Sequence, residues 1–73
     1  MKKKIIIITG GANGLGYELV EESIKNDLFV CNMDRDVEKM NLLSEKYKEN
    51  YKGLIGDISD EEFVKKTIKQ IKI

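Results

Sequence analysis

The hydrophobic pattern of the chain alternates between the periods of strands and helices. An unbroken apolar run over residues 4–9 predicts a strand covered on both faces, as in a parallel sheet. From Gly14 to about Asn26 apolar residues recur at helical spacing, and residues 28–33 form a second apolar run. The predicted apolar stripe of this helix comprises Leu15, Leu19, Val20 and Ile24. The first part of the chain is therefore expected to form a strand, a helix and a strand.

The rest of the chain repeats this alternation. Residues 36–50 predict a second helix, whose apolar stripe should pack in the core and comprises Val37, Met40, Leu43 and Tyr47. Residues 51–58 are a third strand candidate, weakened by two glycines. Ser59 followed by Glu62 predicts a capping box for a last helix that runs to Ile73. The order predicts an α/β fold in one domain over 1–73, a Rossmann-like partial doubly wound parallel sheet of three strands alternating with three helices.

Composition narrows the classes of function. The 73 residues include 13 basic and 13 acidic side chains, so no net charge marks a surface for nucleic acid or an anionic membrane. No segment resembles a transmembrane helix or a signal peptide, and we expect a cytoplasmic protein. Cys31 is the only cysteine and there is no histidine, which argues against a disulfide and a transition-metal site. Within its apolar run this cysteine is expected to be a buried small hydrophobe.

The strongest candidate chemistry lies in residues 9–16, Thr-Gly-Gly-Ala-Asn-Gly-Leu-Gly, between the first strand and the first helix. At such a position backbone N–H groups can meet a phosphate. In this interpretation Gly10 permits the sharp turn, Gly14 lets the chain approach a pyrophosphate and Gly16 allows close packing of helix on sheet. Asn13 suits a turn, and its amide could hold the turn together or touch a ligand. The alternative is that the glycines only make a turn.

Two acids end the later strands. Asp34, 18 residues after Gly16, is placed to accept hydrogen bonds from the adenosine ribose, and its charge favours NAD over NADP. The neighbouring Arg35 points the other way, because a guanidinium can pair with a 2′-phosphate. Asp57 could accept a hydrogen bond from the adenine amino group. Alternatively, Asp34 is an ordinary strand-end acid and Asp57 an ordinary loop aspartate before a cap.

Together these residues resemble the classical short-chain dehydrogenases/reductases. The Thr-Gly-x-x-x-Gly-x-Gly pattern of that family is matched by Thr9, Gly10, Gly14 and Gly16, with Leu15 where isoleucine is commoner. Asp34 is similar to the ribose-binding acid of the family, and Asp57-Ile58 to its adenine-contacting pair. The resemblance implies a nicotinamide dinucleotide as cofactor and, in a whole enzyme, hydride transfer between NAD and an alcohol or carbonyl.

The catalytic motifs of that family are absent. The chain has no Asn-Asn-Ala-Gly motif, and no tyrosine is followed four residues later by lysine: Tyr17 is followed by Glu21, Tyr47 by Tyr51 and Tyr51 by Ile55. We therefore expect an amino-terminal cofactor-binding portion without hydride transfer of its own. The alternatives are a non-enzymatic nucleotide-binding module and a structural or assembly module. A strand order of 3-2-1 would leave the first strand at an edge, where we expect pairing with a second copy in a dimer.

Overall fold

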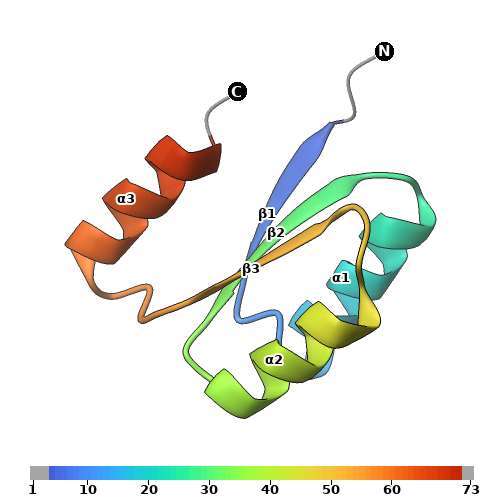
Figure 1. The fold of residues 1–73 in the computed structure, drawn as a ribbon, viewed down its shortest axis with the longest axis horizontal. Coiled ribbons are helices and arrows are strands. Elements are labelled where there is room, and N and C mark those ends of the chain that lie inside the picture. The colour runs from blue at the N-terminus through green and yellow to red at the C-terminus, as the bar shows by residue number, and fades with distance from the viewer. Residues whose placement is uncertain (1–3, 72–73) are drawn as a thin grey trace.

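The computed structural model describes residues 4–71 and shows a three-stranded sheet with helices on both sides (Figure 1). The elements are β1 (Ile5–Thr9), α1 (Gly14–Lys25), β2 (Phe29–Asp34), α2 (Val37–Lys46), β3 (Tyr51–Ile55) and α3 (Glu61–Ile71). The strands are all parallel in the order β1-β2-β3, with Ile7 opposite Cys31 and Asn32 opposite Gly53. The predicted α/β alternation is confirmed. Among residues 4–71, no helix is both long and apolar enough to cross a membrane.

Helices α1 and α2 cover one face of the sheet. One buried cluster joins Ile8, Val20 and Val30, which come from β1, α1 and β2. A second cluster lies beside it and consists of Ala12, Met40 and Leu43. The rings of Tyr47 and Tyr51 pack against both clusters. The two clusters thus form one continuous core beneath both helices, with Met40 in the core as predicted.

The opposite face of the sheet lies toward α3 (Figure 1). Side chains alternate along a strand, so Cys31 and Met33 point away from the α1 and α2 face. Both are buried, and Cys31 is 2% exposed, which confirms the prediction for this cysteine. Thr67 of α3 is also buried. Coverage is incomplete at β1, where Ile7 is 47% exposed, so the prediction of a first strand covered on both faces is wrong for the described residues.

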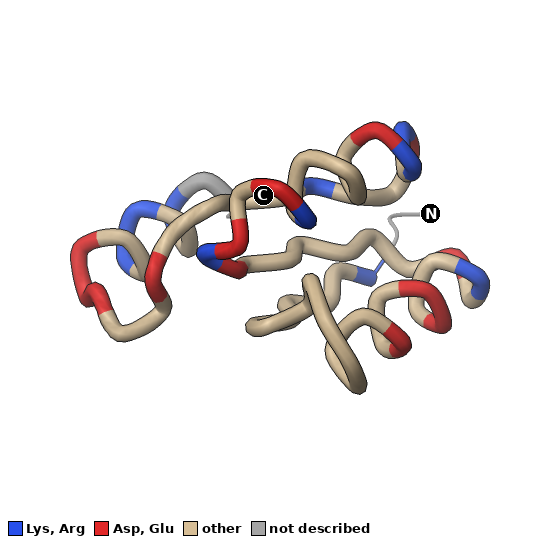
Figure 2. Tube along the Cα trace, turned by 90° about the horizontal axis from the view of Figure 1, so that it is seen from below, with Lys and Arg blue, Asp and Glu red and all other residues tan. Residues whose placement is uncertain are grey.

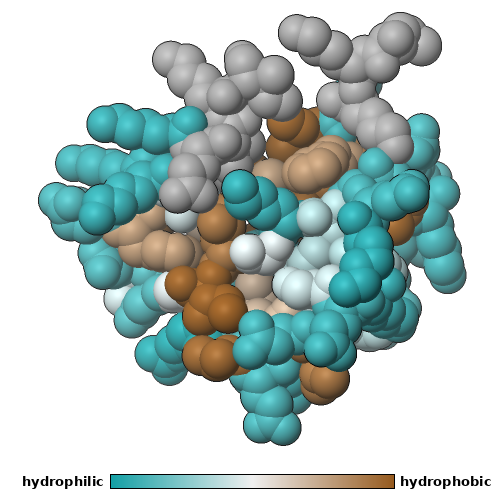
Figure 3. Space-filling view, in the orientation of Figure 1, coloured by the Kyte–Doolittle hydropathy of each residue, from teal (hydrophilic) through white to brown (hydrophobic). Residues whose placement is uncertain are grey.

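The apolar face predicted for α1 is confirmed at Val20 and at Ile24, which packs against the first cluster, and is wrong at Leu15 and Leu19. Leu15 is 80% exposed and Leu19 is also exposed, whereas Val20 and Ser23 are buried. Gly16 lies one turn before Val20, and a Cβ on it would come 2.3 Å from the carbonyl oxygen of Gly10. The side of α1 that lies closest to the turn therefore contains a glycine, and a glycine does not appear in a pattern of hydrophobic residues. Exposed hydrophobic residues are visible among hydrophilic ones in Figure 3.

Three predicted boundaries also differ from the structure. The predicted second helix, 36–50, ends at Lys46, and the predicted third strand, 51–58, ends at Ile55. The predicted capping box at Ser59 is wrong, because Asp60 Oδ1 accepts hydrogen bonds from the N–H groups that begin α3, those of Glu62 at 3.0 Å and Phe63 at 3.3 Å. A carboxylate one residue closer to the helix takes the N-cap role. The predicted end of this helix at residue 73 lies outside the described residues.

Candidate functional site

The glycine-rich turn is fixed to the end of β2. Gly10 N donates a hydrogen bond to Met33 O at 2.8 Å, immediately after β1 ends at Thr9. Gly10 has φ +71° and Gly14 has φ +55°, the left-handed region that favours glycine. A Cβ on either residue would meet nothing within 4 Å. Glycine is needed at both places for the backbone conformation, and the space beside them is open.

Helix α1 starts inside this turn, with Asn13 at its N-cap. The side chain of Asn13 makes no capping hydrogen bond, and its amide oxygen instead accepts one from Lys39 Nζ of α2. The amide therefore contacts α2 and makes no capping bond to the turn itself. The first N–H groups of a helix lack intrahelical acceptors and carry partial positive charge. Such an end can bind a phosphate.

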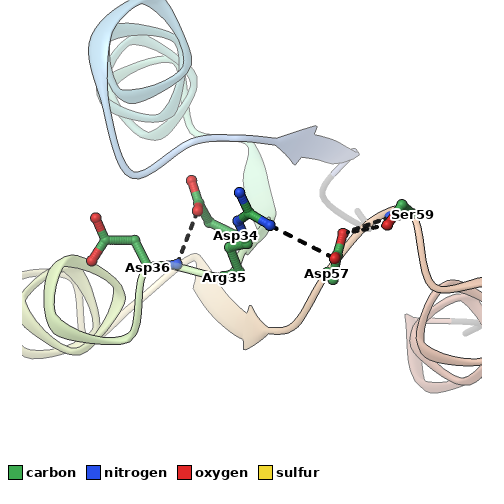
Figure 4. A network of polar contacts seen from close by, with 5 residues as sticks. All are labelled: Asp34, Arg35, Asp36, Asp57 and Ser59. Carbon is green, nitrogen blue, oxygen red and sulfur yellow. Dashed lines mark hydrogen bonds and ion pairs between the residues drawn. The ribbon is translucent and has the colours of Figure 1, made fainter.

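Asp34 connects the glycine-rich turn to α2. Its Oδ2 accepts a hydrogen bond from Ala12 N at 3.1 Å, and its Oδ1 accepts one from Asp36 N at 3.0 Å. Figure 4 shows the contact between Asp34 and Asp36 N, and it also shows Asp57, which follows β3. Two backbone donors from different loops thus fix the orientation of one carboxylate. The sequence predicts the acid at this position but not its bond to the turn.

Asp57 lies across from Asp34 in the loop after β3. Its Oδ1 accepts hydrogen bonds from Ser59 N at 2.9 Å and Ser59 Oγ at 2.7 Å. These bonds, the backbone one first, lower the pKa of Asp57, and the charge of Arg35 acts in the same direction. The Arg35 guanidinium lies 3.8 Å from Asp57 Oδ2, and both side chains are exposed (Figure 4). An exposed pair at that distance contributes little stability, so Arg35 can turn toward another anion.

A cleft of about 410 Å³ joins these groups at the carboxyl ends of all three strands. Its lining residues are Gly10, Met33, Asp34, Arg35, Gly56, Asp57, Ile58 and Ser59. Of the predicted site residues, the cleft brings together Gly10, Asp34, Arg35, Asp57 and Ile58. The remaining predicted residues do not line it: Thr9, Asn13, Gly14, Leu15 and Gly16. The prediction missed Met33, Gly56 and Ser59, each of which is a sequence neighbour of a predicted residue.

The chemistry of the cleft is that of binding. Within the cleft the carboxylates of Asp34 and Asp57 offer acceptors and the Arg35 guanidinium offers donors, and the N-terminus of α1 lies outside the lining. Charged residues cluster on the helices and loops, while most of the strand trace is uncharged (Figure 2). No group of three or more His, Cys, Asp or Glu side chains that could hold a metal ion occurs within residues 4–71. The arrangement suits a ligand with both phosphate and hydroxyl groups.

Comparison with known proteins assigns a family to this arrangement. The family model for short chain dehydrogenase matches residues 4–73. A cis-2,3-dihydrobiphenyl-2,3-diol dehydrogenase of Paraburkholderia xenovorans (strain LB400) is 33% identical over 58 residues, which are 80% of this chain and 21% of that protein. A 1,2-dihydroxy-1,2-dihydronaphthalene dehydrogenase of Pseudomonas putida is 31% identical over 68 residues, 93% of this chain and 26% of that protein. The chain spans between a fifth and about a quarter of these relatives.

Solved structures agree on the fold. A short-chain dehydrogenase from Streptomyces avermitilis superposes with a TM-score of 0.84 at 20% identity, covering 96% of this chain and 26% of the other. The KRED1-Pglu enzyme gives a TM-score of 0.85 at 23% identity, covering 93% of this chain and 29% of its own. Both superpositions cover more than nine tenths of this chain, so they support the same fold for nearly all of it.

Proposed function

Because the chain belongs to the short-chain dehydrogenase family, we propose that its cleft binds the adenosine and pyrophosphate part of a nicotinamide dinucleotide. The observation that carries this proposal is the meeting of Gly10, Asp34 and Asp57 in one cleft at the carboxyl ends of three parallel strands. Ligands of open α/β sheets bind at this end of the strands. In this proposal Gly10 permits the sharp turn, Gly14 and the start of α1 hold the pyrophosphate, and Gly16 allows the helix to approach the sheet.

The hydrogen bonds of Asp34 support a ribose-binding role. Each carboxylate oxygen has two acceptor sites, and the bonds from Ala12 N and Asp36 N use one site on each oxygen. One acceptor site per oxygen is left, which matches the two neighbouring hydroxyls of a ribose. The backbone donors also fix the carboxylate before a ligand arrives, so less side-chain entropy is lost on binding. On the other side of the cleft, Asp57 and Ile58 would contact the adenine.

We propose NAD rather than NADP as the ligand. A 2′-phosphate would stand where the ribose hydroxyl meets Asp34, and two anions at that distance repel. Arg35 is the residue that could reverse this preference, since its guanidinium is exposed and only loosely paired with Asp57. Comparing NAD with NADP therefore tests the balance of these two neighbouring side chains.

The reaction of the whole enzyme is a wider proposal. When bound, the nicotinamide would supply hydride transfer to or from an alcohol or carbonyl. The 73 residues contain no tyrosine with a lysine four positions later, so we propose that this chain binds the cofactor but transfers no hydride by itself. The named relatives are dehydrogenases of aromatic dihydrodiols, and a cyclic diol is one substrate class to test in a complete enzyme. A cytoplasmic location belongs to the same proposal.

A two-dimensional NMR titration of the 73-residue chain with NAD, NADP and AMP tests the binding proposal. We expect saturable shifts at the amides of residues 10–16 and near Asp34, stronger with NAD than with NADP. AMP should reproduce most of the shifts, because the residues in the cleft face the adenosine half. Asp34→Ala should weaken NAD binding at least tenfold, whereas Lys65→Ala on exposed α3 should leave it unchanged.

The outcomes separate the candidate functions. No shift with any nucleotide at millimolar concentration would favour a structural module in which the glycines only form the turn. Binding without stimulation of hydride transfer, even when catalytic residues are supplied by a complementing chain, would favour a non-enzymatic nucleotide-binding module. Equal affinity for NAD and NADP would reject the cofactor preference but retain the site.

A further inference from the structure

Asn32 is a buried polar residue in the middle of β2 that lies outside the lining of the cleft. Its neighbours Cys31 and Met33 point toward α3, so its own side chain points to the face under α1 and α2. There Asn32 Nδ2 donates hydrogen bonds to Met40 Sδ at 3.4 Å and to Tyr51 Oη at 3.3 Å. Two partners from different elements thus hold the plane of this amide in one orientation.

The same amide lies against Gly11, in the middle of the glycine-rich turn. A Cβ on Gly11 would come 2.0 Å from Asn32 Oδ1 and 2.6 Å from Asn32 Cγ, which is closer than nonbonded atoms approach. The glycines with positive φ are Gly10 and Gly14, so the backbone of Gly11 does not itself require a glycine. The space that the amide occupies is therefore the reason for glycine at position 11.

Gly11 also lies close to the start of α1. A Cβ on Gly16 would come 3.0 Å from Gly11 Cα, in addition to its approach to Gly10 O. Gly11 is itself buried, and the residues on either side of it in the turn are hydrogen-bonded to β2. Close packing leaves Gly11 no free space toward Asn32 or toward Gly16, so a change in the size or position of the amide displaces the turn and, with it, the start of the helix.

We propose that Asn32 is a positioning residue for the phosphate-binding turn, an inference that rests on the proposed function. Its amide sets the height of Gly11 above β2, and the packing of Gly11 against Gly16 carries that height to the first turn of α1. In the proposed function Gly14 and this helix start hold the pyrophosphate, so their N–H groups must lie at hydrogen-bond distance from it. An apolar side chain in place of Asn32 would lack the two bonds that fix the amide, and the turn would lose its fixed support.

A double-mutant cycle on the 73-residue chain, read out by NAD titration of the folded population, tests this role. Gly11→Ala places a methyl group against the amide and should weaken NAD binding by about tenfold or more. Asn32→Ala removes the amide, so the double variant should bind NAD more tightly than Gly11→Ala alone. Independent effects would add instead of showing this rescue. Unchanged binding by Gly11→Ala, or a double variant that binds no better than Gly11→Ala, would overturn the proposal.

Val30→Ala is the matched control for a merely structural effect. Val30 is 0% exposed on the same face of β2, two residues before Asn32, and packs in the cluster of Ile8 and Val20. Its truncation should lower stability and leave the NAD affinity of the folded chain unchanged. If Val30→Ala weakens binding as much as Gly11→Ala does, the turn has no specific dependence on Asn32.

Amide hydrogen exchange in Asn32→Leu tests the support of the turn without any nucleotide. The N–H groups of Gly10 and Ala12 are bonded to β2 beside Asn32, whereas Val30 N donates to Asn50 O at 2.9 Å farther along the strand. We expect exchange at Gly10 and Ala12 to quicken by about tenfold more than exchange at Val30. An equal rise at all three amides would overturn the proposal. If the unchanged chain binds no NAD, the proposed function fails, and this comparison still decides whether Asn32 positions the turn.

Discussion

Replacing Asp34 by asparagine should destabilise the fold by breaking the connection between the glycine-rich turn and α2. The carboxylate accepts from Ala12 N at 3.1 Å and from Asp36 N at 3.0 Å. Asparagine keeps one acceptor oxygen and turns an amide donor toward the other N–H, so one bond is lost and two donors face each other. A hydrogen bond to a charged group is worth about 1.5–3 kcal/mol. Because Asp34 is half-buried, we expect a loss of about 2 kcal/mol in the free energy of unfolding.

The measurement is urea unfolding followed by circular dichroism at neutral pH. For a domain of this size a loss of about 2 kcal/mol also lowers Tm by roughly 8–16 °C. Asp36→Asn is the matched control: Asp36 Oδ1 accepts from Lys39 N at 3.1 Å at the N-cap of α2, where asparagine serves as well as aspartate. The control should change stability by only a few tenths of a kcal/mol. If Asp34→Asn stays within about 0.5 kcal/mol of the original chain, the carboxylate does not hold the two loops together.

Two further predictions concern the turn and the loop after β3. Gly16→Ala should lower the urea midpoint much more than Gly10→Ala, because the added Cβ lies 2.3 Å from a backbone oxygen in the first and in open space in the second; equal losses would contradict the close approach. Gly10→Ala should cost only the strain of positive φ, about 1–2 kcal/mol. For Asp57, an NMR pH titration should give a pKa below the ordinary 3.8, partly restored by Ser59→Ala. Its stabilising effect is present above pH 3.8 and is lost as pH falls through the lowered pKa, so a value at or above 3.8 would refute the Ser59 bonds.

The order of elements and the position of the cleft follow from local sequence pattern. Apolar runs and helical spacing alternate clearly, and the residues that end parallel strands meet at one edge of the sheet whatever their side chains are. Gly10, Asp34 and Asp57 could therefore be assigned to one place before their contacts were known. Boundaries depend on distant contacts instead. Tyr47 continues the apolar spacing of α2 in the sequence, yet the helix ends before it at Lys46. The centroid of its ring lies 5.8 Å from that of Tyr51, and both rings pack against the two core clusters.

Asn32 illustrates a constraint that no local pattern reveals. It lies inside the apolar run of β2 and is 0% exposed, and its Nδ2 donates to Tyr51 Oη at 3.3 Å and to Met40 Sδ at 3.4 Å. Its Oδ1 has no hydrogen-bond partner within the described part of the chain, and a Cβ on Gly11 would come 2.0 Å from that atom. Gly11, which falls outside the family pattern, is thus needed by a buried amide from the next strand. Contacts with β2 therefore determine the conformation of the glycine-rich turn as well as its own sequence does. Gly10 N donates a hydrogen bond to Met33 O, and Ala12 N donates one to Asp34 Oδ2.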